Sequence, residues 1–178
     1  MATIRTGIRR AVETMALAPD DRVLEVGCGP GAAAELVCAG LSHGRMLAVD
    51  RSAVAVRRAA ERNAAHVAAG RLEVRRATLA ELDLPPGSFD VAFAVNVNVF
   101  WTSDAAAELD ALGRVLVPGG RLLLAYGDGP AAGMDQRHLD RVEASVAASP
   151  WFEVAHRLDG DHGSALVAVR KAGTADSG

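Results

Sequence analysis

The chain has 178 residues, of which 50% are hydrophobic and 23% are charged, and this composition is typical of a globular protein with one domain. We expect residues 1–171 to form that domain and residues 172–178, which are small and polar, to form a flexible tail. The formal net charge of −3 gives no field that would favour nucleic acid. The sequence has two cysteines, no secretory signal and no apolar run of 18 residues, so we expect a cytoplasmic protein that does not enter a membrane.

Helical and extended patterns alternate along the first half of the chain. Apolar residues at helical spacing are separated from short apolar runs by turns rich in Gly, Pro and Asp. We expect helices over residues 4–17, 32–41 and 53–68, and strands over residues 23–26, 45–49 and 72–74.

The second half continues the alternation and ends in a hairpin. Residues 89–95 are nearly all apolar, as expected for a strand that is buried on both faces. Ser103 is expected to cap a helix that runs to residue 116, and Pro118-Gly119-Gly120 to interrupt the chain after it. The remaining predictions are strands over residues 121–126, 152–157 and 165–170, and a helix over residues 134–148. Together these elements predict an α/β fold with a mostly parallel sheet, helices on both faces and an antiparallel closing hairpin.

A glycine-rich loop lies between the first strand and the helix that follows it, where residues 25–31 read Glu-Val-Gly-Cys-Gly-Pro-Gly. Glycines there permit a tight strand-to-helix turn and let a ligand lie against the backbone, and the helix N-terminus offers N–H groups to a polar ligand. Asp50 ends the second strand, where a carboxylate accepts hydrogen bonds from ribose hydroxyls. This combination predicts a nucleoside cofactor.

The loop satisfies the minimal dinucleotide pattern with Gly27, Gly29 and Ala32, so a nicotinamide-dependent oxidoreductase is an alternative. Two features favour another cofactor. Gly31 makes the spacing Gly-x-Gly-x-Gly, and Glu25 places a carboxylate before the first glycine. A carboxylate at that position suits a ligand with a cationic amino group.

The loop resembles motif I of the class I S-adenosylmethionine-dependent methyltransferases. Three later segments resemble that family in the same order, namely residues 48–52 (Ala-Val-Asp-Arg-Ser), residues 89–96 at the fourth strand, and residues 112–122, which contain Arg-Val-Leu-Val-Pro-Gly-Gly. The resemblance implies a Rossmann-like doubly wound sheet of seven strands in the order 3-2-1-4-5-7-6, with the seventh strand antiparallel. It also implies S-adenosylmethionine as the cofactor.

The resemblance assigns roles to individual residues. Cofactor binding is expected at the loop residues Gly27, Cys28, Gly29 and Gly31, at Glu25 near the methionine end, at Asp50 on the ribose, at Arg51 near the adenine, and at Asn96 near the methionine portion. The family often has an acidic residue after the third strand that binds the adenine amino group. This chain has Ala77-Thr78-Leu79 there, so Thr78, Leu79 or backbone groups are expected in its place.

Methyl transfer is an in-line displacement, in which the protein mainly aligns the acceptor and excludes water. A catalytic side chain is therefore not assigned, and no histidine or cysteine spacing predicts a metal. A small-molecule acceptor is expected, in a pocket near Asn98, Phe100, Trp101, Tyr126 and His138, although the aromatic residues are as readily explained by core packing. A non-catalytic relative that binds the cofactor or a partner protein is the second alternative, and the oligomeric state stays open.

Overall fold

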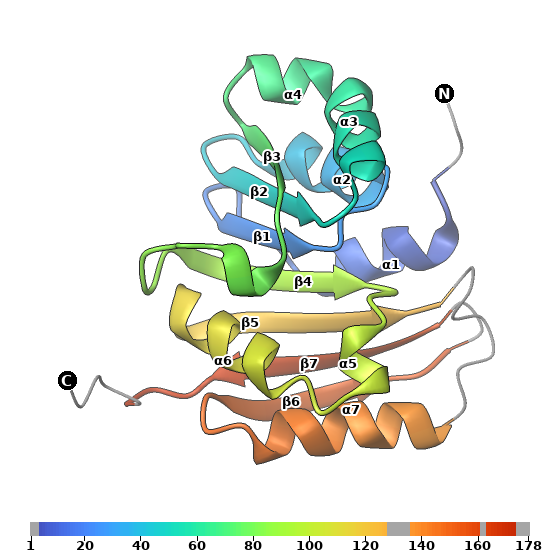
Figure 1. Ribbon diagram of the computed structural model, residues 1–178, viewed down its shortest axis with the longest axis vertical. Helices are drawn as coiled ribbons and strands as arrows, with labels where there is room; N and C mark the ends of the chain where they lie inside the picture. The colour runs from blue at the N-terminus through green and yellow to red at the C-terminus, as the bar shows by residue number, and fades with distance from the viewer. Residues whose placement is uncertain (1–3, 128–135, 161–162, 174–178) are drawn as a thin grey trace.

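The computed structural model describes residues 4–127, 136–160 and 163–173. Its seven strands form one sheet in the order β3-β2-β1-β4-β5-β7-β6 (Figure 1). Strands β1 to β5 are parallel, and β7 is antiparallel to both of its neighbours, β5 and β6. The expected strand order and the antiparallel seventh strand are therefore confirmed. The strands are β1 (Arg22–Val26), β2 (Arg45–Asp50), β3 (Leu72–Arg76), β4 (Phe89–Val95), β5 (Leu116–Tyr126), β6 (Phe152–Leu158) and β7 (Ser164–Arg170).

Helices cover both faces of the sheet, and each face has its own hydrophobic core. Figure 1 shows α1 and α2 behind the sheet and α5, α6 and α7 in front of it. Alternate residues of a strand belong to alternate cores, so Val23 packs with α2 and Leu24 with α6. The helical elements are α1 (Thr6–Thr14), α2 (Ala32–Gly40), α3 (Ala53–Arg62), α4 (Ala64–Ala68), the 3₁₀ turn η1 (Leu79–Glu81), α5 (Val99–Thr102), α6 (Ala106–Val115) and α7 (Gln136–Ala148).

The single helix expected over residues 53–68 is wrong, because Asn63 divides it into α3 and α4. Asn63 is 2% exposed, and its side-chain Nδ2 donates hydrogen bonds to the carbonyl oxygens of Gly31 and Ala59. A buried amide needs such partners, and these lie where the helix ends. The helical pattern continues across this position in sequence, so only the tertiary contact explains the break.

The expected helix from Ser103 to residue 116 is also wrong in its start. Ser103 follows the short helix α5, its hydroxyl donates to the carbonyl of Val99, and α6 begins only at Ala106. Pro118-Gly119-Gly120 lies inside β5, which begins at Leu116 and bulges against β4 between Phe89 and Val91. Residues 134–135 of the expected helix over residues 134–148 lie outside the described residues.

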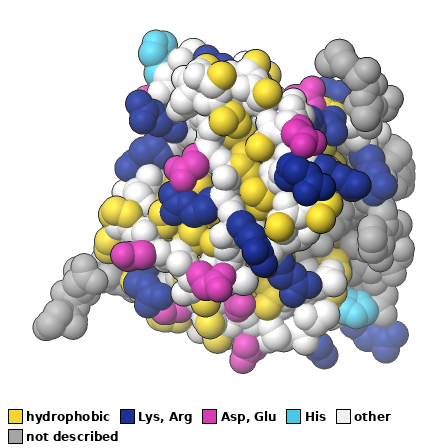
Figure 2. Space-filling model, turned by 45° about the horizontal axis from the view of Figure 1, so that its top comes forward, with side chains coloured by type: hydrophobic (Ala, Val, Ile, Leu, Met, Phe, Trp, Pro, Cys, Tyr) yellow, Lys and Arg dark blue, Asp and Glu magenta, His cyan; other side chains and the backbone are white. Residues whose placement is uncertain are grey.

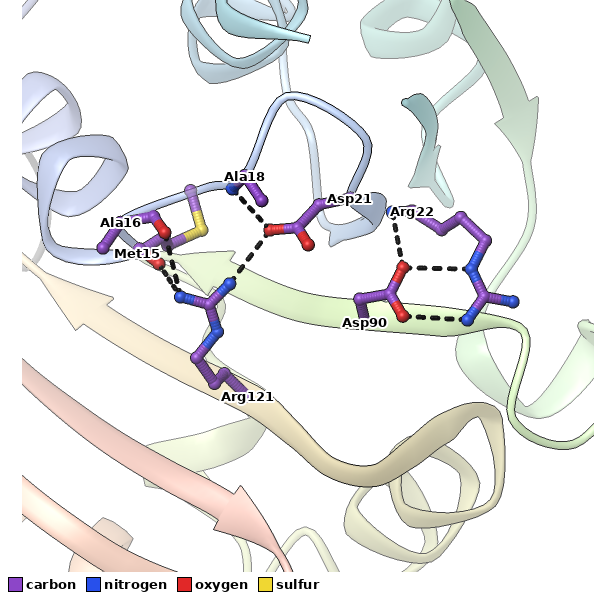
Figure 3. Close-up of polar contacts among 7 residues, drawn as sticks. All are labelled: Met15, Ala16, Ala18, Asp21, Arg22, Asp90 and Arg121. Carbon is purple, nitrogen blue, oxygen red and sulfur yellow. Dashed lines mark hydrogen bonds and ion pairs between the residues drawn. The ribbon is translucent and has the colours of Figure 1, made fainter. Parts of the chain in front are cut away.

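One arginine fixes the end of α1 to the sheet (Figure 3). The Arg121 guanidinium donates to the carbonyl oxygens of Met15 and Ala16 and forms an ion pair of 2.9 Å with Asp21. Asp21 in turn accepts a hydrogen bond from the N–H of Ala18. A cation is favourable at these carbonyls because the C-terminal end of a helix is electronegative and leaves its last carbonyls unpaired.

A second arginine joins the starts of β1 and β4. Arg22 donates from its backbone N–H, Nε and Nη2 to the two carboxylate oxygens of Asp90 (Figure 3). These hydrogen bonds lower the pKa of Asp90 below its usual value. Both arginine contacts therefore stabilise the amino-terminal edge of the sheet.

The surface mixes the two signs of charge. Figure 2 shows basic and acidic side chains interspersed around exposed hydrophobic atoms on one face of the molecule. Among the helices of the described residues, none has the length and apolar character needed to cross a membrane.

Candidate functional site

The carboxyl ends of β1, β2 and β4 border a cavity of about 570 Å³. Ligands of open α/β sheets bind at this edge, and the volume is in the range of small-molecule sites. Six of the ten predicted cofactor residues line the cavity, namely Gly27, Asp50, Arg51, Thr78, Leu79 and Asn96. The other four, Glu25, Cys28, Gly29 and Gly31, are in β1 and the glycine loop but do not line it.

The glycines of the loop are required for different structural reasons. All three have left-handed backbone conformations, with φ of 70° at Gly27, 51° at Gly29 and 76° at Gly31. A Cβ at Gly27 would lie 2.5 Å from Cγ2 of Val97, so this glycine lets the segment after β4 approach the loop. Gly31 instead lies against Asn63 and Ala59, where a Cβ would clash. Gly31 therefore serves the packing of α2 on α3.

The N–H groups of the loop already have partners within the protein. Gly27 and Cys28 both donate to the carbonyl oxygen of Val49, and Gly31 donates to the carbonyl of Cys28. Gly29 donates to Oδ2 of Asp50 at 2.9 Å. These hydrogen bonds hold the loop in shape against β2 and its last residue, Asp50.

Asp50 is half-buried at the end of β2 and is bound at both carboxylate oxygens. Oδ2 accepts from Gly29, and Oδ1 accepts from the N–H of Ser52 at 2.8 Å. Each carboxylate oxygen has a second lone pair, so the side chain can still accept two hydrogen bonds from a ligand. The contacts fix the orientation of these acceptors at the border of the cavity.

Glu25 is 3% exposed, and its Oε2 has no hydrogen-bond partner among the described residues. Burial, with a contribution from the nearby Asp50 carboxylate, raises the pKa of Glu25 to about 8. A buried carboxyl without a partner is unfavourable, and a cationic group of a ligand would relieve it. This orphaned oxygen fits the cationic amino group that the sequence predicts near Glu25.

Cys28 is buried beside the same carboxylates. Burial first, and then the charges of Glu25 and Asp50, raise the pKa of its thiol far above the usual range. The thiol therefore stays protonated, and a small packing residue is the physical description that fits it.

The segment after β3 places Thr78 and Leu79 in the cavity wall. Thr78 donates from its N–H and its hydroxyl to one carboxylate oxygen of Glu81, at 2.8 Å each. These hydrogen bonds lower the pKa of Glu81. The N–H of Ala77 donates to the carbonyl of Asp50. The hydroxyl of Thr78 is thus engaged by Glu81, an acidic residue two positions after the Ala77-Thr78-Leu79 segment.

Asn96 and Asn98 both line the cavity, but their side chains differ in surroundings. The Asn96 side chain exchanges two hydrogen bonds with the backbone of Gly127, at 2.8 and 3.0 Å. Asn98 is exposed, and its carbonyl accepts hydrogen bonds from Trp101 and Thr102 at the start of α5.

The predicted acceptor residues do not line one common cavity, because Asn98 lines the first cavity and Tyr126 lines another. Phe100 is 1% exposed and belongs to the core, so core packing is the correct description for it. Trp101 packs against Tyr126 with ring centroids 5.0 Å apart. The hydroxyl of Tyr126 is buried without a hydrogen-bond partner in the described part of the chain, and burial raises the pKa of this group. His138 is exposed on α7 and lines neither of the two cavities at this edge of the sheet.

A second cavity, of about 360 Å³, lies between α1 and the ends of the central strands. The exits of β4 and β5 and the turn between β6 and β7 form its other walls. It is lined by Gly7, Arg10, Ala11, Glu13, Thr14, Val95, Ala125, Tyr126, Gly127, Leu158, Asp159, Gly160, Gly163, Ser164 and Ala165.

Several residues that line the two cavities have no sequence pattern that predicts this position. Val97, Val99 and Glu108 line the first cavity, and Arg10 and Glu13 line the second. A valine after a strand or a charge on an amphipathic helix is ordinary, so only the three-dimensional arrangement identifies them. Among the described residues, no group of three or more His, Cys, Asp or Glu side chains could hold a metal ion.

A family model described as a methyltransferase domain matches residues 23–120. These residues run from β1 into β5 and include the glycine loop and Asp50, and they make up more than half of the chain. No curated protein matches the chain by sequence.

Solved structures share the fold. An S-adenosylmethionine-dependent methyltransferase from Aquifex aeolicus superposes with a TM-score of 0.74 at 18% identity, covering 92% of this chain and 89% of that one. A geranyl diphosphate methyltransferase in complex with S-adenosylmethionine gives a TM-score of 0.72 at 12% identity, with coverages of 93% and 85%. The YcgJ protein from Bacillus subtilis gives 0.70 at 14% identity, with coverages of 94% and 99%. At these identities the likeness establishes the fold.

Proposed function

Because this chain belongs to the methyltransferase domain family and uses S-adenosylmethionine, we propose that it transfers the methyl group to a small-molecule acceptor by in-line displacement. The observation that carries this proposal is Asp50, whose two carboxylate oxygens are oriented at the edge of the cavity by backbone N–H groups of the glycine loop and of α3's start.

The residues of the first cavity fit this cofactor. Asp50 would accept from the ribose hydroxyls, and Arg51, Thr78 and Leu79 would border the adenine. Glu25 does not line this cavity, but its neighbour Val26 does, and the amino group of the methionine portion would pair the orphaned oxygen of Glu25. When bound, the cofactor supplies a methyl group that its cationic sulfonium has already activated. The chain's own residues then orient the two reactants and exclude water.

The acceptor is assigned to the second cavity. This cavity and the cofactor cavity lie on opposite sides of one contact, because Asn96 lines the first, Gly127 lines the second, and the two residues are hydrogen-bonded. A volume of about 360 Å³ suits a small molecule. The helix α1 forms one wall of this cavity, so the N-terminal helix would border the bound acceptor.

Replacing Asp50 with Ala is expected to raise the dissociation constant for S-adenosylhomocysteine at least 100-fold. Hydrogen bonds to a charged group contribute about 1.5–3 kcal/mol each, and two are lost, while each 1.4 kcal/mol is tenfold in affinity. Isothermal titration calorimetry measures the change. Asp83→Ala, which removes an exposed carboxylate outside the cavity, serves as the control and should bind like the wild type. Equal binding by wild type and the Asp50 variant would contradict the site.

Transfer itself is tested with a methyl-labelled cofactor and a panel of small oxygen, nitrogen, sulfur and carbon nucleophiles. The proposal expects label in at least one acceptor, and loss of that label in the Asp50→Ala variant. Tight cofactor binding without label in any acceptor would instead favour a binding role, and binding of NADH without S-adenosylmethionine would overturn the cofactor assignment.

A further inference from the structure

Asn96 has an unusual backbone conformation at the end of β4. Its φ is 58°, in the left-handed region that residues other than glycine seldom adopt, although asparagine tolerates it best among them. The cost of this conformation is of order 1 kcal/mol or more, and it persists only where surrounding contacts hold it. The contacts that hold Asn96 therefore identify what the conformation is for.

The side chain of Asn96 continues the β4–β5 pairing by one step. The last regular pair is Val95 with Ala125, and the N–H of Asn96 still donates to the carbonyl of Ala125 at 2.9 Å. Beyond it the amide side chain takes the place of a strand. Nδ2 donates to the carbonyl of Gly127 at 2.8 Å, and Oδ1 accepts from the N–H of Gly127 at 3.0 Å. At neutral pH, where an aspartate of the same length is ionised, the asparagine amide supplies both the donor and the acceptor.

The same residue fixes the segment that follows β4. Val97, its neighbour, lies against Gly27 so closely that a Cβ there would be 2.5 Å from Cγ2 of Val97. Val97 and Asn98 are walls of the cofactor cavity, and Gly127 is a wall of the second cavity. A shift at Asn96 would therefore move one wall of each cavity.

We propose that Asn96 is a positioning residue that holds the exits of β4 and β5 together, and with them the border between the cofactor cavity and the acceptor cavity. This role does not require the direct contact with the methionine portion that the sequence predicts, because the two hydrogen bonds that fix the side chain are both made with Gly127. The proposal rests on the proposed function for the identity of the two cavities, but not for the contact itself.

Three variants separate the possible roles. Asn96→Gly keeps access to the left-handed conformation and removes the side chain. Asn96→Asp keeps an acceptor for the N–H of Gly127 but, while ionised, faces the carbonyl of Gly127 with a negative charge. Ser103→Ala is the control, because it removes another side-chain hydrogen bond from the segment between β4 and α6 at a residue that lines neither cavity.

The first measurement is the amide hydrogen exchange of Gly127 by NMR in cofactor-free protein. In the Asn96→Gly variant, the protection factor of this N–H should be at least tenfold lower than in the wild type. In the Ser103→Ala control, it should stay at the wild-type value. In the Asp variant the protection should recover as the pH is lowered through the ordinary titration range of an aspartate, roughly from 6 to 3, because protonation restores a donor toward the carbonyl. In the wild type, the protection factor of this N–H, corrected for the intrinsic exchange rate, should not rise over the same pH range.

The second measurement is the dissociation constant for S-adenosylhomocysteine. A positioning role predicts a rise of about three- to tenfold in the Gly variant, well below the effect of Asp50→Ala. Unchanged protection of Gly127 together with a 100-fold loss of affinity would make Asn96 a direct ligand and overturn the inference. Unchanged protection and affinity would overturn it as well. Wild-type protein that does not bind the probe at all would refute the proposed function, whereas the exchange result would still test the contact.

Discussion

Raising the pH from 5 to 8 is expected to lower the unfolding free energy of the cofactor-free protein, and Glu25→Gln should remove most of this dependence. Glu25 is buried with an orphaned oxygen, and burial raises its pKa from 4.5 to about 8. The folded protein therefore keeps a proton that the unfolded chain has already released. Because the folded state binds more protons between these two values, its stability falls as the pH rises through this window.

The expected slope is at most about 1.4 kcal/mol per pH unit, and it ends near pH 8, where Glu25 is ionised in both states. Urea denaturation at each pH measures it. Glu61→Gln, which changes an exposed carboxylate on α3, should keep the wild-type slope. A flat wild-type profile would show that the carboxyl is ionised in the folded protein at low pH, and an equal slope in the Glu25 variant would show that other groups cause the dependence.

The same residue gives a signature of cofactor binding. A cationic amino group beside Glu25 favours the ionised carboxylate, so binding at pH 7 should release a proton from the wild type. Calorimetry in buffers of different ionisation enthalpy detects this release. The Glu25→Gln variant should release fewer protons on binding, because it lacks this carboxyl.

Gly113→Ala is expected to destabilise the protein by roughly 1–3 kcal/mol, although alanine is the better helix former. A Cβ at Gly113, on the buried side of α6, would lie within 2.1 Å of Cγ of Trp151. The indole has little freedom to move, because its Nε1 donates to Asp110 at 2.7 Å and the Arg170 guanidinium stacks on the ring. Overpacking therefore has to displace either the helix or a ring that polar contacts hold on two sides.

Gly40→Ala is the matched control for this substitution. Gly40 ends α2, and a Cβ there has no heavy atom within 4 Å, so the change should be neutral or stabilise by about 0.5–1 kcal/mol. Thermal and urea unfolding compare the two variants. Equal stability of the two would mean that Trp151 repacks without cost, contrary to the geometry.

The strands of the sheet were predictable because their signals are local, whereas the order of the strands was predicted from the family resemblance. The strand of residues 89–95 is apolar on both faces, and such runs between helical patterns permit few topologies. The position of Asp50 at the end of a strand beside the glycine loop was predictable for the same reason. A glycine loop and an acidic strand end are separated by one helix and occur in a fixed order.

The parts that could not be predicted depend on contacts between distant segments. Asn63 ends a helix only because Gly31 lies beside it, and Asn96 turns toward Gly127 because β5 ends next to β4. Phe100 follows a strand end, where a ligand wall and a core residue have the same pattern, and only burial distinguishes them. Periodicity describes which face a residue occupies along one element, but not which partner it meets.

The carbonyl oxygen of Val49, which accepts hydrogen bonds from both Gly27 and Cys28, has a consequence for how this site tolerates mutation. A main-chain acceptor is present whatever side chain residue 49 has, so substitutions there leave the anchoring of the loop in place as long as β2 itself forms. The shape of the loop is thereby buffered against sequence drift in the strand that supports it. At Asp50, by contrast, the anchor of Gly29 is the side chain itself, so a substitution there removes it.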